Sequence, residues 1–138
     1  MEGNGVHVPG RRSMTAVVLG GSGFLGSHLC DALLARGQDV IAVDDLSTGR
    51  LQNIEHLTGN KYFKFIQADI SIGLPDLGTP ELILNFASPA SPPAYLSMPI
   101  HTMRTGSLGT MHALELASKA NTRFIMASTS EIYGDPLE

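Results

Sequence analysis

Short apolar runs and longer amphipathic segments alternate along the chain. The apolar runs have the length of buried strands and lie at 16–19, 40–43, 62–66, 81–84 and 123–127. Residues 24–36 and 100–119 instead repeat apolar side chains every three or four positions, which predicts helices, and 51–57 predicts a short helix. This alternation predicts a doubly wound, parallel α/β sheet of the Rossmann type, with about five strands and right-handed crossovers.

Single residues and short segments allow further predictions about a helix end, a loop, an edge strand and a helix face. Gly37 stands where a glycine that ends the first helix is expected. The stretch 85–99 is rich in proline and serine, so we expect a long functional loop there. The strand at 123–127 is the last one, and it should present an unpaired edge and uncovered apolar side chains. In the second long helix, one stripe collects Met103, Leu108, Met111, Leu114 and Ala117.

A glycine loop joins the first strand to the first helix. Gly20, Gly23 and Gly26 have the spacing G-x-x-G-x-x-G, which lets the backbone turn tightly and approach a phosphate beside the free N–H groups of a helix N-terminus. Asp44 ends the next strand, roughly 20 residues after the loop, where a carboxylate that holds ribose hydroxyls is expected. The pattern predicts a dinucleotide site. The alternative is a tight strand-to-helix turn without a ligand.

Composition narrows the classes of function. The 138 residues have room for one domain, and the net charge of −4 without a Lys/Arg cluster argues against nucleic acid as a partner. No run of 18 apolar residues occurs, so we expect no membrane span. The single Cys30 lies in a predicted helix as a small buried thiol, which fits a reducing cytoplasm. The five histidines lack ligand spacing, so no metal is expected.

The first residues differ from the rest. Residues 1–14 include Arg11 and Arg12 among glycine, histidine and proline, without an apolar signal segment, and predict a flexible leader or tag. Residues 15–138 then form the domain.

Polar residues follow each predicted strand, where parallel α/β sheets bind ligands. Asp69 follows the third strand and either accepts a hydrogen bond from an adenine amino group or is solvated. Thr129 and Glu131 follow the last strand; they either contact a substrate, with Glu131 as acid or base, or cap a helix.

Several segments together resemble the extended short-chain dehydrogenase/reductase superfamily, and within it the UDP-glucuronate decarboxylases. They are the glycine loop, Asp44, Asp69 and the two long segments 87–95 and 127–136, which are the most specific. The resemblance runs from about Thr15 to Glu138. It implies NAD as cofactor, a nucleotide sugar as substrate, and conversion of UDP-glucuronate to UDP-xylose through a 4-keto intermediate.

The resemblance also implies roles for individual residues. The pyrophosphate would meet Gly20, Gly23, Phe24, Leu25 and Gly26. The adenosine ribose and its surroundings would meet Asp44, Asp45, Ser47, Thr48 and Gly49; the adenine would meet Asp69 and Ile70. The central part of NAD would meet Phe86, Ala87 and Ser88. Thr129 and Glu131 match catalytic positions, and Arg104 matches a basic position near the substrate carboxylate, although a solvated helix charge is an equal alternative.

The chain also departs from the family pattern. None of its three tyrosines is followed by lysine four residues later, so the Tyr-x-x-x-Lys pair that accepts the sugar proton is missing. The family pattern expects that pair, further strands and a substrate domain beyond the end of this chain. Gly106 and Asn85 stand where the family commonly has Asn and His. We therefore expect a chain that is inactive alone and that forms a homo-oligomer or associates with a complementary chain.

Two other functions stay open. An NAD-dependent nucleotide-sugar 4-epimerase or 4,6-dehydratase shares the glycine loop, but is not expected to carry Ser-Pro-Ala-Ser-Pro-Pro. A non-catalytic NAD-binding module would bind the cofactor without turnover.

Overall fold

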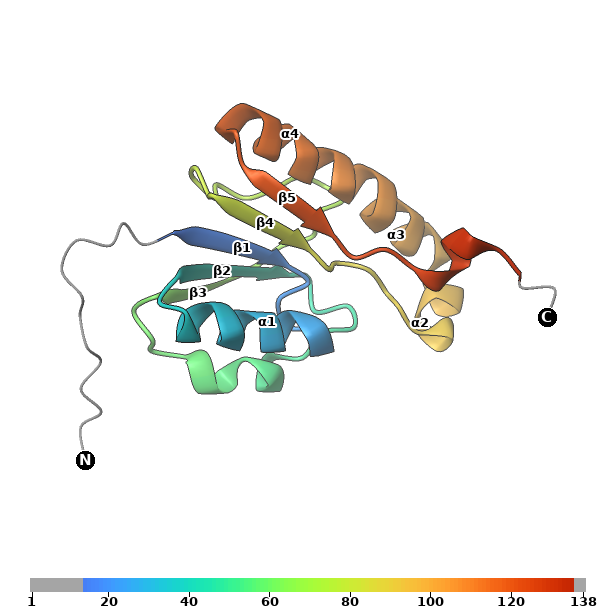
Figure 1. Ribbon diagram of the computed structural model, residues 1–138. Coiled ribbons are helices and arrows are strands. Elements are labelled where there is room, and N and C mark those ends of the chain that lie inside the picture. The colour runs from blue at the N-terminus through green and yellow to red at the C-terminus, as the bar shows by residue number, and fades with distance from the viewer. Residues whose placement is uncertain (1–13, 136–138) are drawn as a thin grey trace.

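The computed structural model describes residues 14–135 and contains a five-stranded parallel sheet (Figure 1). The strands lie in the order β3-β2-β1-β4-β5. Their bounds are β1 Thr15–Leu19, β2 Asp39–Asp44, β3 Phe63–Gln67, β4 Leu82–Asn85 and β5 Arg123–Met126. The Rossmann-like fold class is therefore confirmed. The predicted leader lies, except for Met14, outside the described residues.

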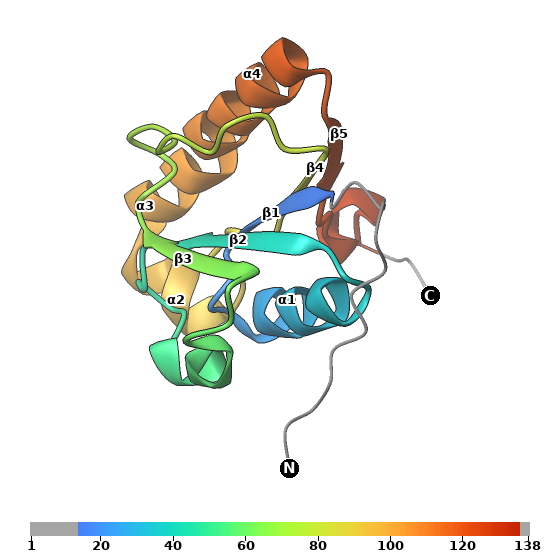
Figure 2. The same ribbon diagram turned by 90° about the vertical axis from the view of Figure 1, so that its left-hand side faces the viewer.

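Helices cover both faces of the sheet (Figure 2). One face carries α1 (Phe24–Ala35) and two single-turn 3₁₀ helices at Leu51–Asn53 and Glu55–Leu57, whereas the prediction was one short helix. The other face carries α3 (Pro99–Arg104) and α4 (Thr110–Ala120). Successive side chains of a strand point to opposite faces, so β1 is buried on both sides and contributes to two apolar cores.

The first crossover agrees with its sequence pattern. Gly37 follows α1 with φ +75°, a conformation that favours glycine, and its N–H donates to the carbonyl of Leu34 at 2.9 Å. Cys30 is fully buried under α1, and burial, with a smaller contribution from the charge of Asp31, raises the pKa of its thiol to about 12. The expectation of a buried thiol is confirmed, and this thiol is not a nucleophile.

The prediction of a loop over 85–99 is wrong for the second half of this stretch. Residues Pro92–Ser97 form a short helix, α2. Its two prolines occupy the first helical positions, where no intrahelical partner for their N–H groups exists and where the fixed φ of proline suits a helix. The two prolines therefore mark the start of this helix and not a loop.

The long helix predicted for 100–119 is interrupted, and the face that it buries differs from the predicted one. A π-helical turn, Thr105–Gly109, joins α3 to α4. The expected apolar stripe is mostly exposed at Met103, Leu108, Met111 and Leu114, whereas Thr105, Gly109, Ala113 and Ala117 are buried. Small residues are buried here because the helix packs closely: Ala113 and Ala117 pack with the strands, and a Cβ added at Gly109 would come within 2.7 Å of Ile70 in the loop after β3.

The order of the strands locates the ligand-binding edge. Strand β1 lies between β2 and β4: the chain first adds β2 and β3 on one side of β1 and then returns to add β4 and β5 on the other. In open α/β sheets, ligands bind outside the carboxyl ends of the strands at such a switch point. The glycine loop after β1 and the segment after β4 meet there.

Gly26→Ala is expected to destabilise the chain by about 1–3 kcal/mol, because a side chain at this position has no room. A Cβ on Gly26 would overlap the carbonyl oxygen of Gly20 and press on the Cα of Gly21. Urea denaturation measures the change, with Gly106→Ala as control, since a Cβ there meets no atom within 4 Å. Equal midpoints for the two variants would contradict this packing.

Candidate functional site

A cavity lies at the carboxyl ends of the central strands. It is lined by Gly20, Gly23, Val43, Asp44, Asp45, Ser47, Thr48, Ala68, Asp69, Ile70, Phe86, Ala87, Ser88, Pro89, His101 and Thr105. Eleven of these sixteen residues are ones that the family resemblance assigned to the cofactor. The fold thus brings together residues from four loops, the end of β2, α3 and the π-helical turn.

The glycine loop forms one wall of the cavity with its backbone. The N–H groups of Gly20 and Gly21 donate to the carbonyl of Val43 at 2.8 and 3.2 Å, which fixes the loop against β2. A Cβ on Gly23 would meet only the carbonyl oxygen of Gly20, at 3.2 Å, so the space in front of Gly23 is open. The first N–H groups of α1 have no acceptor within the helix. This arrangement suits a phosphate group.

Asp44 is held rigidly beside the glycine loop. It is 8% exposed, and its two carboxylate oxygens accept hydrogen bonds from the N–H of Ser22 at 3.0 Å and of Leu46 at 2.9 Å. Gly49 does not line the cavity but leaves room for this carboxylate, since a Cβ there would collide with Ser22 and Asp44. Asp44 is therefore fixed before any ligand arrives.

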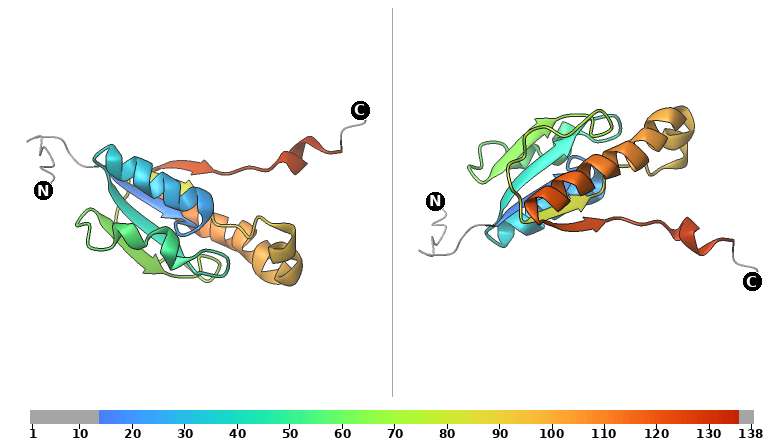
Figure 3. Two further views of the ribbon diagram at one scale, coloured as in Figure 1. Left: turned by 90° about the horizontal axis from the view of Figure 1, so that it is seen from below. Right: turned by 90° about the horizontal axis from the view of Figure 1, so that it is seen from above.

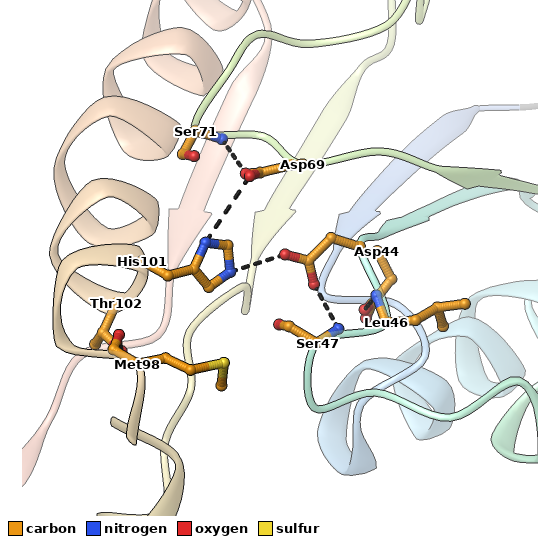
Figure 4. A network of polar contacts seen from close by, with 9 residues as sticks. Asp44, Leu46, Ser47, Asp69, Ser71, Met98, His101 and Thr102 are labelled. Atoms are coloured by element: carbon orange, nitrogen blue, oxygen red, sulfur yellow. Dashed lines mark hydrogen bonds and ion pairs between the residues drawn. The ribbon is translucent and has the colours of Figure 1, made fainter. Parts of the chain in front are cut away.

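His101 on α3 joins the loops that follow β2 and β3. Its Nε2 lies 2.8 Å from Oδ2 of Asp45, and its Nδ1 lies 3.8 Å from Oδ2 of Asp69. Figure 4 shows the ring between Asp69 and the loop that carries Ser47. Within residues 14–135, these three residues are the one group whose ligand atoms lie close enough together for a metal ion. The sequence spacing does not predict this group, because Asp45, Asp69 and His101 come together only in the folded chain.

Asp69 carries a perturbed carboxyl group. Desolvation by burial acts to raise its pKa, but hydrogen bonds from the side chain and the N–H of Ser71 and the positive charges of His101 and Arg104 outweigh it. The net effect lowers the pKa below its ordinary value. Asp69 is therefore a charged acceptor at neutral pH.

The segment after β4 forms the far wall of the cavity. The amide of Asn85 bridges this segment to α4: its Nδ2 donates to the hydroxyl of Thr110 at 3.2 Å, and its Oδ1 accepts from the N–H of Ala87 at 3.3 Å. Thr105, which sequence reasoning missed, is 6% exposed, and its hydroxyl has no hydrogen-bond partner in the described structure. A buried, unpaired hydroxyl at a cavity wall is ready to bind a polar ligand atom.

The comparisons with known proteins identify the family of the chain. Residues 16–138 match the family described as the NAD dependent epimerase/dehydratase family. The chain belongs to this family. It is 45% identical to UDP-glucuronic acid decarboxylase 1 of Arabidopsis thaliana over 129 residues, which cover 94% of this chain and 29% of that protein. The resemblance predicted from the motifs is confirmed.

Two solved structures of epimerases have the same fold. UDP-glucose 4-epimerase of Thermotoga maritima, determined with UDP-glucose, matches with a TM-score of 0.75 and 31% identity over 91% of this chain and 41% of that one. UDP-glucose 4-epimerase of Thermus thermophilus, determined with NAD, matches with a TM-score of 0.67 and 29% identity over 84% of this chain and 38% of that one. The chain thus spans less than half the length of these relatives.

Seven predicted site residues of this epimerase/dehydratase chain do not line the cavity. They are Phe24, Leu25, Gly26, Gly49, Arg104, Thr129 and Glu131. The side chains of Phe24 and Leu25 are exposed at the start of α1, so only their backbone N–H groups face a phosphate site. Arg104 is exposed on α3, but its charge acts on Asp69.

Thr129 and Glu131 lie in the segment that follows β5. Figure 3 shows this segment running past the end of the sheet, apart from α2 and α3 in both views. Both residues are exposed, and Thr129 makes no capping hydrogen bond to the 3₁₀ turn Ser130–Tyr133 that follows it. Thr129 therefore occupies the N-cap position of this turn, as the alternative interpretation expected, but does not cap it through its side chain.

The helices give no sign of a membrane segment. Among residues 14–135, none combines the length and the apolar composition needed to cross a bilayer.

Proposed function

We propose that this chain is the NAD-binding portion of a nucleotide-sugar enzyme that converts UDP-glucuronate to UDP-xylose. The observation that carries the proposal is the open backbone face of Gly23 next to the fixed carboxylate of Asp44, at the switch point of the sheet. The similarity to UDP-glucuronic acid decarboxylase 1 of Arabidopsis thaliana supports this particular reaction among those of the family.

The cavity residues offer a contact for each part of NAD. Gly20 and Gly23 leave space for the pyrophosphate, Asp44 faces the adenosine ribose, and Asp69 offers a charged acceptor to the adenine amino group. Phe86, Ala87 and Ser88 line the middle, where the free hydroxyl of Thr105 offers a further contact. A carboxylate at Asp44 repels the 2′-phosphate of NADP, so the cofactor is NAD.

Bound NAD would supply reversible hydride transfer at C4 of the sugar, as the family resemblance implies. In the proposed enzyme, Thr129 hydrogen-bonds the reacting sugar, Glu131 acts in the decarboxylating step, and Arg104 attracts the sugar carboxylate. The group that accepts the C4 proton is missing from this chain, because it carries no Tyr-x-x-x-Lys pair.

Asp44→Ala is expected to weaken NAD binding about tenfold and to reduce the preference for NAD over NADP. The variant removes the acceptor for the ribose hydroxyls and also the repulsion of a 2′-phosphate. Isothermal titration with each nucleotide measures both effects, with Asp76→Ala as control, because Asp76 is an exposed loop residue away from the cavity. An unchanged ratio of NAD to NADP affinity would contradict the role of Asp44.

A 4-epimerase or a 4,6-dehydratase is the alternative enzyme, favoured by the likeness to UDP-glucose 4-epimerases. A non-catalytic module that holds NAD is the other alternative, favoured by the missing catalytic pair.

One experiment distinguishes the three proposed functions: the chain is mixed with the part of the Arabidopsis decarboxylase that follows the matched region. CO₂ and a UDP-pentose from UDP-glucuronate support our proposal, UDP-galactose from UDP-glucose supports the epimerase, and NAD binding without either product supports the module.

We also propose that the chain self-associates or pairs with a complementary chain. β5 is one of the two edge strands of the sheet, and Ile125 and Met126 on it are 47% and 48% exposed. A flat, apolar edge is a template for pairing with another strand. Light scattering is expected to give a mass above that of the monomer at micromolar concentration. A folded monomer whose melting temperature does not change on dilution would contradict this proposal.

A further inference from the structure

The imidazole of His101 spans the adenosine end of the cavity. Asp45 follows β2 and Asp69 follows β3, so the ring on α3 connects three separate segments (Figure 4). The side chains of His101, Asp45 and Asp69 are each about one-quarter exposed. The ring therefore lies in a partly exposed wall of the cavity, between two carboxylates assigned above to the adenosine.

Both carboxylate oxygens of Asp45 have polar partners. Its Oδ2 is 2.8 Å from Nε2 of His101, and its Oδ1 accepts a hydrogen bond from the N–H of Ser47 at 2.8 Å. Asp69 is held on its other side, where Oδ1 accepts from the N–H of Ser71 at 2.8 Å. A nucleotide that uses Asp45 or the free side of Asp69 must first displace the ring.

The size of the cavity agrees with a closed entrance. Its volume is about 60 Å³, whereas sites that enclose a ligand usually offer about 300–1,000 Å³. Ligand atoms of all three residues lie within 4.8 Å of one another, a separation that leaves no room for an adenine ring between them.

The geometry favours a bridging ring over a metal ion at this position. The two nitrogens of His101 face different carboxylates, on opposite sides of the ring, so a single ion at one nitrogen leaves the other contact unused. Nε2 lies within hydrogen-bond distance of Asp45, whereas Nδ1 makes a longer contact of 3.8 Å with Asp69. Arg104, one turn further along the chain, adds positive charge near Asp69.

We propose that His101 is a latch that closes the adenosine end of the NAD site in the free chain and opens when NAD enters. The proposal rests on the proposed function, because it requires NAD to bind in this cavity. A latch multiplies the apparent affinity by the fraction of molecules that are open, so that one-fifth open lowers the affinity fivefold. For a partly exposed ion pair, an open fraction of about one-fifth is expected, equivalent to about 1 kcal/mol.

The test measures NADH binding and thermal stability together. His101→Ala is expected to bind NADH about fivefold more tightly, with a faster association rate in stopped-flow fluorescence, because no contact has to break first. The same variant is expected to melt at a lower temperature without ligand, because α3 loses its tie to the loop after β2. A merely structural residue would lower both affinity and stability, so the opposite signs identify a latch.

A matched control exists on the surface. His56→Ala removes a similar pair, since Nε2 of His56 lies 2.7 Å from Oδ1 of Asp31, and both side chains lie away from the cavity. It should leave NADH affinity and association rate unchanged. His101→Gln, whose amide cannot bridge both carboxylates, should lie between wild type and His101→Ala and serves if the alanine variant does not fold.

The outcomes separate this proposal from the proposed function. If wild type binds NADH and the His101 variants bind equally or more weakly, the latch is overturned and the NAD site stands. If neither wild type nor any folded variant binds NADH, the NAD site itself is overturned, and the latch with it.

Discussion

Gly23→Val is expected to abolish NAD binding while the chain stays folded. A Cβ at this position contacts only the carbonyl oxygen of Gly20, at 3.2 Å, and Gly23 has φ −72° and ψ 175°, which any residue adopts. The backbone conformation accepts a side chain and Gly20 has to shift by only a few tenths of an ångström, but the methyl groups of valine are expected to fill the space in front of the loop where the pyrophosphate must lie. We expect a loss of affinity of about 100-fold or more, equivalent to about 2.7 kcal/mol.

Isothermal titration of NAD into wild type, Gly23→Ala, Gly23→Val and Gly106→Ala checks this expectation. The loss should grow from alanine to valine, and Gly106→Ala should bind as wild type, because its Cβ meets no atom within 4 Å. Melting curves verify that each variant is folded. Equal NAD affinity for wild type and Gly23→Val would place the pyrophosphate elsewhere.

The 138-residue chain alone is expected to give no turnover of UDP-glucuronate. In the family that the chain resembles, a lysine lowers the pKa of a tyrosine so that it accepts the C4 proton near neutral pH. Tyr62, Tyr95 and Tyr133 are followed four residues later by Ile66, Pro99 and Leu137. None of the three tyrosines lines the cavity, and all are exposed. No tyrosine is therefore set up for this step.

Mass spectrometry of UDP-sugars after incubation with NAD and UDP-glucuronate measures the turnover. Gly23→Val, purified in the same way, is the control for host enzymes, since contaminating activity would persist in it. Multiple turnovers by wild type and none by Gly23→Val would show that this chain contains another base.

The sequence predicted those parts of the fold that depend on local patterns. The buried strands and α1 follow from apolar periodicity, and Gly23 and Asp44 follow from a spacing that reflects one strand-helix-strand unit. The burial of α4 could not be predicted in this way. Its apolar residues Met111 and Leu114 are exposed, while Gly109 and Ala113 are buried, because the distance between helix and sheet is a property of the whole fold.

The sequence predicted only those site residues that belong to a recognisable motif. Asp69 was predicted from its place after the third strand and Asp45 from the family resemblance, but their link through His101 depends on two loops and α3 meeting at one edge of the sheet. Thr105 was missed for a similar reason, since its unpaired hydroxyl becomes meaningful only when the π-helical turn buries it beside the cavity. α2 was missed because proline was interpreted as a helix breaker, although it is favoured in the first turn.

Nuclear magnetic resonance of the ¹⁵N-labelled chain during titration with NAD tests most directly whether the cavity is the cofactor site. We predict that shifts concentrate on the amides of Gly20–Gly26, of Asp44–Thr48 and of Asp69 and Ile70, while those of β5 and of the outer face of α4 stay unchanged. Saturating NAD that leaves the glycine loop unperturbed, or that perturbs mainly the exposed face of α4, would contradict the account.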